Sequence, residues 1–194
     1  MAKKLVILSA TLAVLIPIIV HLRNVSWSNS SLAMVLFPVF GILAFTLLWL
    51  HSMAGVFEVW LRERFDFDFF VHWSSLVILV SMIAHPLLLL ILIKFNFSLL
   101  FSGPSRGIIF GIIGLALLLT YDLGKMLKKW EFFSRNWNAI LIVSTIGTIF
   151  IFFHSLMIGS DLQSGWTRKL WIFYGVTAIL ATIYTYGIKM FLRK

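Results

Sequence analysis

The stretch Val71–Ile93, VHWSSLVILVSMIAHPLLLLILI, decides the fold of this chain. It carries no formal charge and is long enough to cross a bilayer, which takes about 20 apolar residues. It also contains two histidines, His72 and His85. An imidazole in hydrocarbon is costly unless a partner satisfies it, so a histidine inside a membrane helix indicates a functional site.

The composition of the whole chain agrees with a membrane protein. Of its 194 residues, 61% are hydrophobic and 12% are charged, and the mean hydropathy is +1.02. Soluble domains carry roughly twice this share of charged residues. The apolar runs are continuous rather than alternating, which argues against an outer-membrane barrel. We therefore predict an all-α, polytopic membrane protein.

Six apolar runs predict a six-helix transmembrane bundle that forms a single domain over residues 1–194. The expected spans are about 5–21, 32–50, 71–93, 107–123, 139–158 and 170–188. The first follows the basic start Met1–Lys4, as a signal peptide would, but no small-x-small cleavage site follows, so we expect an uncleaved span. The segment Gly55–Asp68 mixes charges with aromatic residues and is expected at the membrane interface.

The formal net charge of +9 comes from short loops between the spans. Membrane topology and anionic lipid head groups explain such a distribution better than nucleic acid does. Eleven Lys and Arg fall on the side of the amino terminus and five on the other side; the eleven are Lys3, Lys4, Arg62, Arg64, Lys125, Lys128, Lys129, Arg135, Lys189, Arg193 and Lys194. We predict both termini in the cytoplasm, in a bacterial-type inner (plasma) membrane.

The chain has no cysteine. Disulfides, cysteine-ligated iron–sulfur clusters, thiolate-ligated haem and covalently attached c-type haem are therefore excluded. A haem in this protein would be bound non-covalently, with histidine as the expected ligand. The sequence has neither a G-x-G-x-x-G motif after a strand nor a P-loop, so a nucleotide or flavin domain would belong to another polypeptide.

The strongest candidate site is the pair His85 and His154. His85 lies about fourteen residues into the third span and His154 about fifteen into the fifth, so both sit roughly 20–23 Å from the inner face. Two imidazoles at matched depth can bind one haem iron axially, and such six-coordinate iron carries electrons rather than activating a substrate. The alternative is two separate histidines, each bonded to a serine, a backbone carbonyl or water. Ser81 and Ser155 are near enough to hold the second nitrogens.

The other histidines are weaker candidates. His72 and His51 lie at the inner ends of the third and second spans, where they either bind a cofactor together or simply reach water. His21, at the outer end of the first span, is expected at the interface.

The glycines of the fourth span and the tryptophans each have a structural and a cofactor-related interpretation. Gly107, Gly111 and Gly114 favour close helix packing, although the same gap would admit the edge of a macrocycle. The tryptophans, Trp171 among them, are expected as interface anchors rather than as electron-transfer groups.

These residues resemble the ferric reductase-like transmembrane domain. That family is shared by ferric reductases, NADPH oxidases and the haem membrane subunit of the bacterial methionine sulfoxide reductase system. The features in common are six spans, His72 with a later His85-Pro86, a glycine-bearing fourth span, a basic loop with tryptophan, and His154. The resemblance covers residues from about Leu50 to Tyr186.

The resemblance implies two stacked b-type haems, each held by one histidine from the third span and one from the fifth. His85 and His154 match the outer pair. The inner pair is incomplete, because the position expected to face His72 falls near Leu141. Three options remain open: one haem only, an inner haem held by His72 with His51, or a flavin or quinone bound at the inner side.

The expected function is thus a b-type haem membrane cytochrome that carries electrons across the membrane as part of an oxidoreductase. A separate flavoprotein reductase or quinol would be the electron donor, and ferric iron, oxygen or an oxidised protein the acceptor. The alternative is a cofactor-free structural or assembly protein of the membrane. Transport ranks last, because the carboxylates of Glu58 and Asp122 lie at the edges of the spans.

Overall fold

The computed structural model describes residues 2–102 and 105–189. Two of the eleven basic residues predicted on the inner side, Arg193 and Lys194, lie outside the described residues. Helices account for almost all of this part, and no strand occurs in it. The long helices are α1 (Ala2–Asn24), α2 (Leu32–Val56), α4 (Phe67–Leu92), α6 (Ser105–Met126), α8 (Trp137–Ile158) and α9 (Gly165–Thr182). The short ones are α3 (Glu58–Arg62), α5 (Phe97–Phe101), α7 (Glu131–Arg135), the 3-10 turn η1 (Ser160–Leu162) and the π-helix η2 (Ile183–Lys189).

Six helices are long and apolar enough to cross a membrane, the sixth being α9 continued into η2. The prediction of an all-α six-helix membrane bundle is confirmed. Many large apolar side chains of these helices face outward, for example Leu5 (55% exposed), Val80 (53%) and Leu180 (58%). Such surfaces suit lipid rather than water.

The helix ends depart from the predicted spans where capping side chains set them. The carboxylate of Asp66 accepts a bond from the amide of Phe69 at 3.0 Å, so α4 starts at Phe67 rather than at Val71. The hydroxyl of Ser31 accepts from the amide of Met34 and starts α2 at Leu32, as predicted. Helices extend into polar sequence in this way because a cap satisfies free backbone N–H groups at their start.

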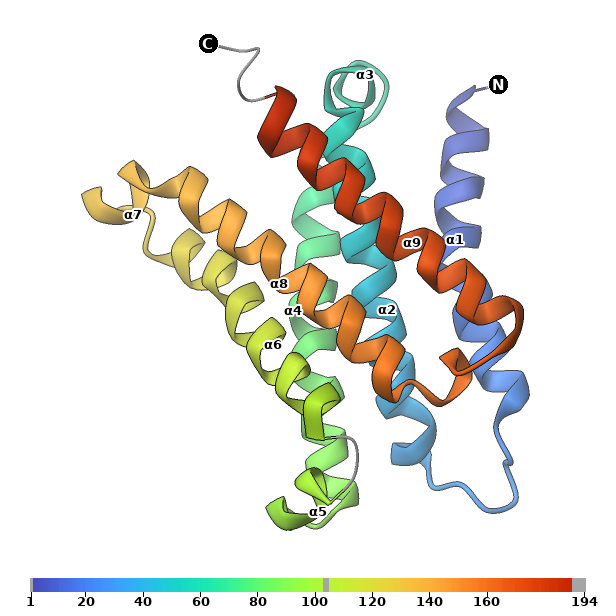
Figure 1. Ribbon diagram of the computed structural model, residues 1–194. Coiled ribbons are helices and arrows are strands. Elements are labelled where there is room, and N and C mark those ends of the chain that lie inside the picture. The colour runs from blue at the N-terminus through green and yellow to red at the C-terminus, as the bar shows by residue number, and fades with distance from the viewer. Residues whose placement is uncertain (1, 103–104, 190–194) are drawn as a thin grey trace.

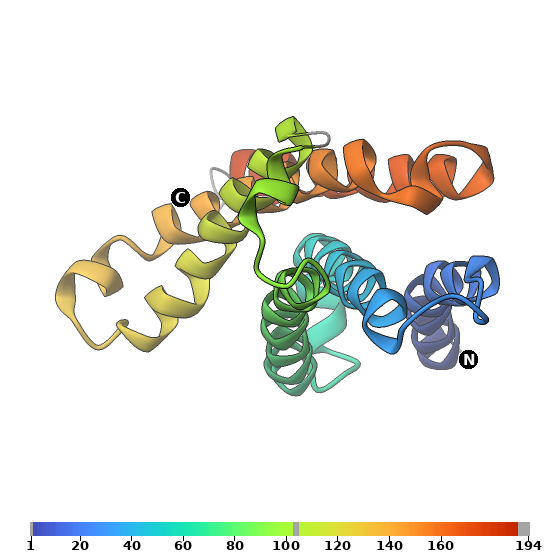
Figure 2. The same cartoon turned by 90° about the horizontal axis from the view of Figure 1, so that it is seen from below.

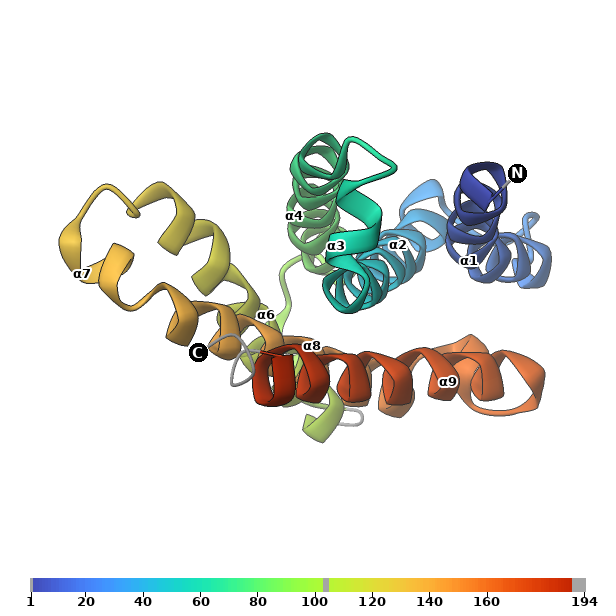
Figure 3. The ribbon, with the colours of Figure 1, turned by 90° about the horizontal axis from the view of Figure 1, so that it is seen from above.

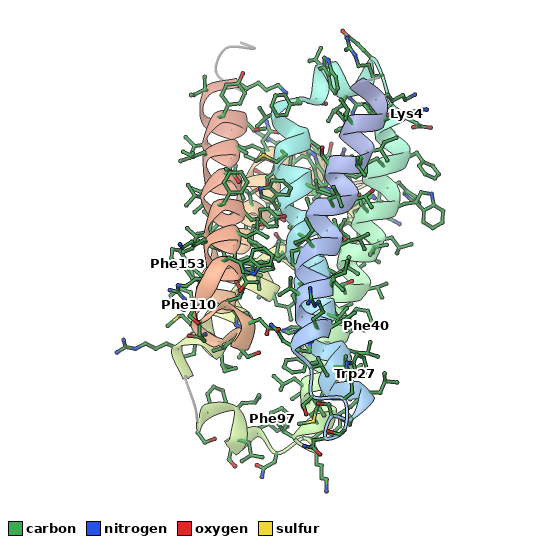
Figure 4. The ribbon with its side chains drawn as sticks, turned by 90° about the vertical axis from the view of Figure 1, so that its right-hand side faces the viewer. Lys4, Trp27, Phe40, Phe97, Phe110 and Phe153 are labelled. Carbon is green, nitrogen blue, oxygen red and sulfur yellow. The ribbon has the colours of Figure 1, made fainter. Side chains whose placement is uncertain are left out.

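The chain turns back at two ends of the bundle (Figure 1). The start of α1, both α3 and α7, and the close of η2 lie at one end, called here the α3/α7 end. The helix α5 and the turn η1 lie at the opposite end, called the α5 end. Lys4 of α1 and Trp27 of the following loop mark these two ends in Figure 4. In the described residues, nine Lys and Arg of the predicted basic side gather at the α3/α7 end.

Seen along the bundle, the spans form two layers. The helices α4, α2 and α1 form one row, and α9, α8 and α6 form the other layer (Figures 2 and 3). The two most intimate pairs are α2 with α4 and α6 with α8. We call α2–α3–α4 the first hairpin and α6–α7–α8 the second hairpin.

The core is made of two buried clusters. One contains Phe45, Phe152, Trp171 and Tyr174 and joins α2, α8 and α9. The other contains Ala44, Ile78, Met82 and Leu118 and joins the two hairpins. The prediction that Trp171 anchors the interface is wrong, because its ring is only 2% exposed.

Candidate functional site

His85 sits in a socket made by α2. Its Nδ1 lies 2.6 Å from the backbone oxygen of Phe37, and its ring stacks on the Phe37 ring with centroids 5.4 Å apart. One helical turn later on α2, a Cβ added to Gly41 would lie 2.9 Å from Nδ1 of His85. No real side chain tolerates such a contact, so glycine is what lets the imidazole approach α2.

His154 sits in an equivalent socket made by α6. Its Nδ1 lies 2.8 Å from the backbone oxygen of Gly107, and a Cβ added to Gly111 would lie 2.5 Å from that nitrogen. In the same way, the side chains of Ile158 and Ile151 of α8 occupy the space that a Cβ would need at Gly107 and Gly114. Close helix packing is thus what these three glycines provide.

The two sockets repeat each other. In both, a histidine bonds a carbonyl that lies four residues before a glycine on the preceding helix of the same hairpin. Gly41 and Gly111 each follow a phenylalanine, Phe40 and Phe110, which lie on opposite sides of the bundle in Figure 4. The short helices α3 and α7 each begin with Glu and end with Arg. The two hairpins therefore share this way of holding a histidine.

The hydrogen bonds fix the tautomer of both histidines. A backbone carbonyl only accepts, so each Nδ1 carries the hydrogen and each Nε2 keeps its lone pair. In the described part of the chain, neither Nε2 has a hydrogen-bond partner. The serines expected as partners do not hold these nitrogens: the hydroxyl of Ser155, for example, donates to the oxygen of Phe152 and accepts from Trp171.

The sockets bring the two rings together. The centroids of His85 and His154 are 6.2 Å apart and the ring planes are nearly perpendicular, at 88°. Each histidine helix packs mainly on the preceding helix of its own hairpin, α4 on α2 and α8 on α6. Within the described residues, no three His, Cys, Asp or Glu side chains gather as a metal-binding group. The pair therefore offers two nitrogen ligands from two hairpins and no more.

A cavity of about 250 Å³, lined by apolar side chains together with hydroxyl-bearing and ionisable ones, lies between the hairpins, on the α3/α7 side of the histidine pair. It reaches Met82, one turn before His85, and it is closed on one side by α9 and η2. Its lining includes His51, Tyr121, Asp122 and Tyr186. Leu141 also lines it, so an apolar side chain occupies the position where the resemblance would place an inner histidine.

His51 faces this cavity with a fixed tautomer. Its Nε2 lies 2.6 Å from the hydroxyl of Ser74, and that hydroxyl donates its own hydrogen to the oxygen of Phe70. Nε2 must therefore be the donor, and Nδ1 is left with a lone pair.

His72 lies elsewhere. Its side chain is exposed, and within the described residues its ring has one ring neighbour, the edge of Trp73, with centroids 5.6 Å apart. A rotation of roughly 200° for two residues on a helix puts His72 on the face of α4 opposite Ser74. The structure does not bring His72 to His51, and pairing them around an inner haem has no support in this geometry.

His21 is buried rather than interfacial, at 6% exposure. Its Nδ1 lies 2.6 Å from a carboxylate oxygen of Asp161 and its Nε2 lies 3.3 Å from the oxygen of Val35. Asn24 adds a bond to the same carboxylate at 3.1 Å. His21 therefore ties α1 to α2 and to the α8–α9 connection at the α5 end.

Ionic contacts close the rim of the cavity at the α3/α7 end. The amino group of Lys189 donates to the oxygen of Gly55 at 2.9 Å and lies 3.4 Å from Glu58, which also pairs with Arg62. Partial burial raises the pKa of Glu58, but the hydrogen bonds and charges of Arg62 and Lys189 outweigh it and hold that pKa below its ordinary value.

Two positions of the candidate site were missed by the sequence analysis. Gly41 had a signal, because a Phe-Gly step recurs at residues 40–41 and 110–111. Thr185, which lines the cavity with a buried and unpaired hydroxyl, had none, because its placement depends on the π-helix η2. Comparisons with models of known protein families, with curated proteins and with solved structures gave no match.

Proposed function

We propose that this chain is a b-type haem cytochrome of the membrane, similar to the ferric reductase-like transmembrane domain, and that it carries electrons across the bilayer. The supporting observation is the separation of 6.2 Å between the imidazole centres of His85 and His154. Two coaxial imidazoles that bind one metal at about 2 Å from each nitrogen have centres roughly 6 Å apart. The observed pair fits this requirement.

The donor set favours haem over a bare metal ion. Two neutral imidazoles leave most of a metal's positions unfilled, whereas haem iron brings four nitrogens of its own and needs two axial ligands. His85 and His154 would hold it, one from each hairpin. When bound, such iron has no open position and supplies one-electron transfer.

The protein's own contribution is orientation. The carbonyls of Phe37 and Gly107 fix each ring and raise the basicity of the free nitrogen, as second partners of metal-bound histidines do. Gly41 and Gly111 allow each ring to lie close against the neighbouring helix, α2 for His85 and α6 for His154. We propose one haem, because the cavity side offers a single inward-facing histidine.

The excess of basic residues at the α3/α7 end supports placing that end, with both termini, in the cytoplasm of a bacterial-type inner membrane. Electrons would arrive there from a separate flavoprotein reductase or quinol. They would leave near the α5 end, toward ferric iron, oxygen or an oxidised protein.

A cofactor-free structural role is the alternative. It is favoured by the Nδ1 bonds, which by themselves hold α4 on α2 and α8 on α6. In that case the two histidines are packing groups, and the free Nε2 atoms have no ligand.

The absorption spectrum of protein purified from haem-replete cells decides between these functions. The cytochrome should show a Soret band that shifts and sharpens with dithionite, at about one haem per chain. His85→Ala and His154→Ala should each lose the band, while the matched control His72→Ala keeps it because that side chain is exposed. A colourless wild-type protein would leave only the structural alternative.

A further inference from the structure

The cavity next to the histidine pair has room for several waters and polar side chains that could bind them. Its volume is about 250 Å³, whereas one water occupies about 30 Å³ of liquid. The hydroxyl of Thr185 is buried and has no partner among the described residues. A buried polar atom without a protein partner calls for an ordered water. Thr185 belongs to a π-helix, a conformation that recurs at functional sites.

Two proton-exchanging side chains face this chamber from opposite hairpins. Asp122 has no hydrogen bond or ion pair within the described part of the chain, and it lies about one turn before the end of the spanning helix α6. His51 presents the lone pair of Nδ1, because Nε2 donates to Ser74. A carboxylate and an imidazole nitrogen are both groups that take up a proton from water.

The other ionisable groups around the chamber are few. Tyr121 of α6 and Tyr186 of η2 line it, while α4 and α8 contribute hydroxyls and apolar side chains. Lys125 follows Asp122 by one turn. At the rim, Lys189 is bound to Gly55 and Glu58. The His51 imidazole and the Asp122 carboxylate are therefore the lining groups that can gain a proton.

The chamber is close enough to the histidine pair to respond to its charge. Met82 lines it and is one turn from His85. His51 lies ten residues beyond Gly41 on α2, or about 15 Å along the helix. Charges at this distance inside a low-dielectric bundle are screened much less than charges in water.

We propose that the cavity is a redox-linked proton site. When one electron from the donor arrives at the centre held by His85 and His154, one proton from the medium binds to the Asp122 carboxylate or to Nδ1 of His51. The proton compensates the added negative charge and is released when the electron leaves. This inference rests on the proposed function and adds to it a binding site for protons and water.

The midpoint potential of the haem, measured by spectroscopic titration across pH, tests the coupling. For the wild type we expect the potential to fall as pH rises, by at most about 59 mV per pH unit for one proton per electron. The double variant His51→Gln/Asp122→Asn should lose this dependence. The double control His72→Gln/Glu131→Gln removes the same kinds of groups outside the cavity and should keep it.

The outcomes separate the two proposals. A haem-containing protein with a pH-independent potential overturns the proton site alone, and so does a double variant that keeps the wild-type slope. A colourless protein overturns the proposed function and the coupling together.

The presence of water in the cavity can be tested independently of haem. The chain has no natural cysteine, so a single introduced cysteine can be labelled specifically. Ser75 lines the cavity, whereas its neighbour Leu76 is 45% exposed on the outer face of α4 at the same depth. In membranes, a small water-soluble methanethiosulfonate should modify Ser75→Cys and spare Leu76→Cys. A Ser75→Cys protein that resists modification overturns the water-filled chamber. A ring-shaped ligand that fills the cavity would produce this result.

Discussion

The imidazole rings of His85 and His154 stand perpendicular to each other at 6.2 Å, although each is oriented entirely by its own hairpin. The pair is therefore a product of two separate sockets that face one gap. Changes in one socket should disturb one ring and leave the other in place.

Filling a socket should expel its histidine. In Gly111→Ala the new Cβ would lie 2.5 Å from the ring of His154, and in Gly41→Ala 2.9 Å from that of His85. Overpacking of this kind costs about 1–3 kcal/mol. We expect both variants to lower the thermal unfolding midpoint and the haem content. Gly55→Ala is the control, since its Cβ meets Thr185 at an ordinary 3.6 Å. Full haem binding by Gly111→Ala would contradict the role of the socket.

Removing the hydroxyl of Ser74 should destabilise the fold without altering the histidine pair. In Ser74→Ala the N–H of His51 loses its acceptor, which costs about 1–3 kcal/mol for a buried group. Denaturant or thermal unfolding in detergent measures this loss, and the haem spectrum should not change. Ser75→Ala serves as the neighbour control, because that hydroxyl bonds only within its own helix. Equal effects of both variants would refute the assigned hydrogen bond.

Asp161 should matter more than its loop position suggests. Asp161→Ala leaves both His21 and Asn24 without their carboxylate, at a cost of about 1.5–3 kcal/mol. Asn24→Ala removes only the exposed bond and should cost less. Limited proteolysis of the α1–α2 connection and thermal unfolding would both report the loosening of α1. If Asn24→Ala lowered the unfolding midpoint more than Asp161→Ala, the assigned role of Asp161 would be contradicted.

Glu58 should make stability depend on acidity. Because its folded pKa is lowered by Arg62 and Lys189, it contributes stability above its unfolded pKa of about 4.3 and loses that contribution as pH falls through the folded value. The unfolding midpoint of the wild type should therefore exceed that of Glu58→Gln at neutral pH, and the gap should close in acid. The exposed Glu131→Gln at the same end is the control, and a gap that widens in acid would oppose the assignment.

Much of this architecture could be predicted from the sequence, because spans of this length are set by hydropathy alone. The matched depth of His85 and His154 followed from counting residues along straight helices. The starts of the spans were less accurate at Phe67 and Gly165, where helices continue into polar sequence.

The remaining features depend on contacts that no local pattern encodes. His21 meets Asp161 across 140 residues of sequence, so its burial could not be seen in its own polar surroundings. Trp171 is buried because α9 crosses over α2 and α8, a packing that hydropathy does not specify. The haem itself stays a prediction, since the ring separation supports it without testing it.

The two sockets have a consequence for assembly. Each hairpin holds its own imidazole with a backbone carbonyl of the same hairpin. We therefore expect each ring to be oriented before the two hairpins pack together. Only the width of the gap between the halves is left to be set at docking. A prosthetic group would then act as a spacer that registers two preformed halves, and chains split between α5 and α6 should reassemble more readily in its presence than without it.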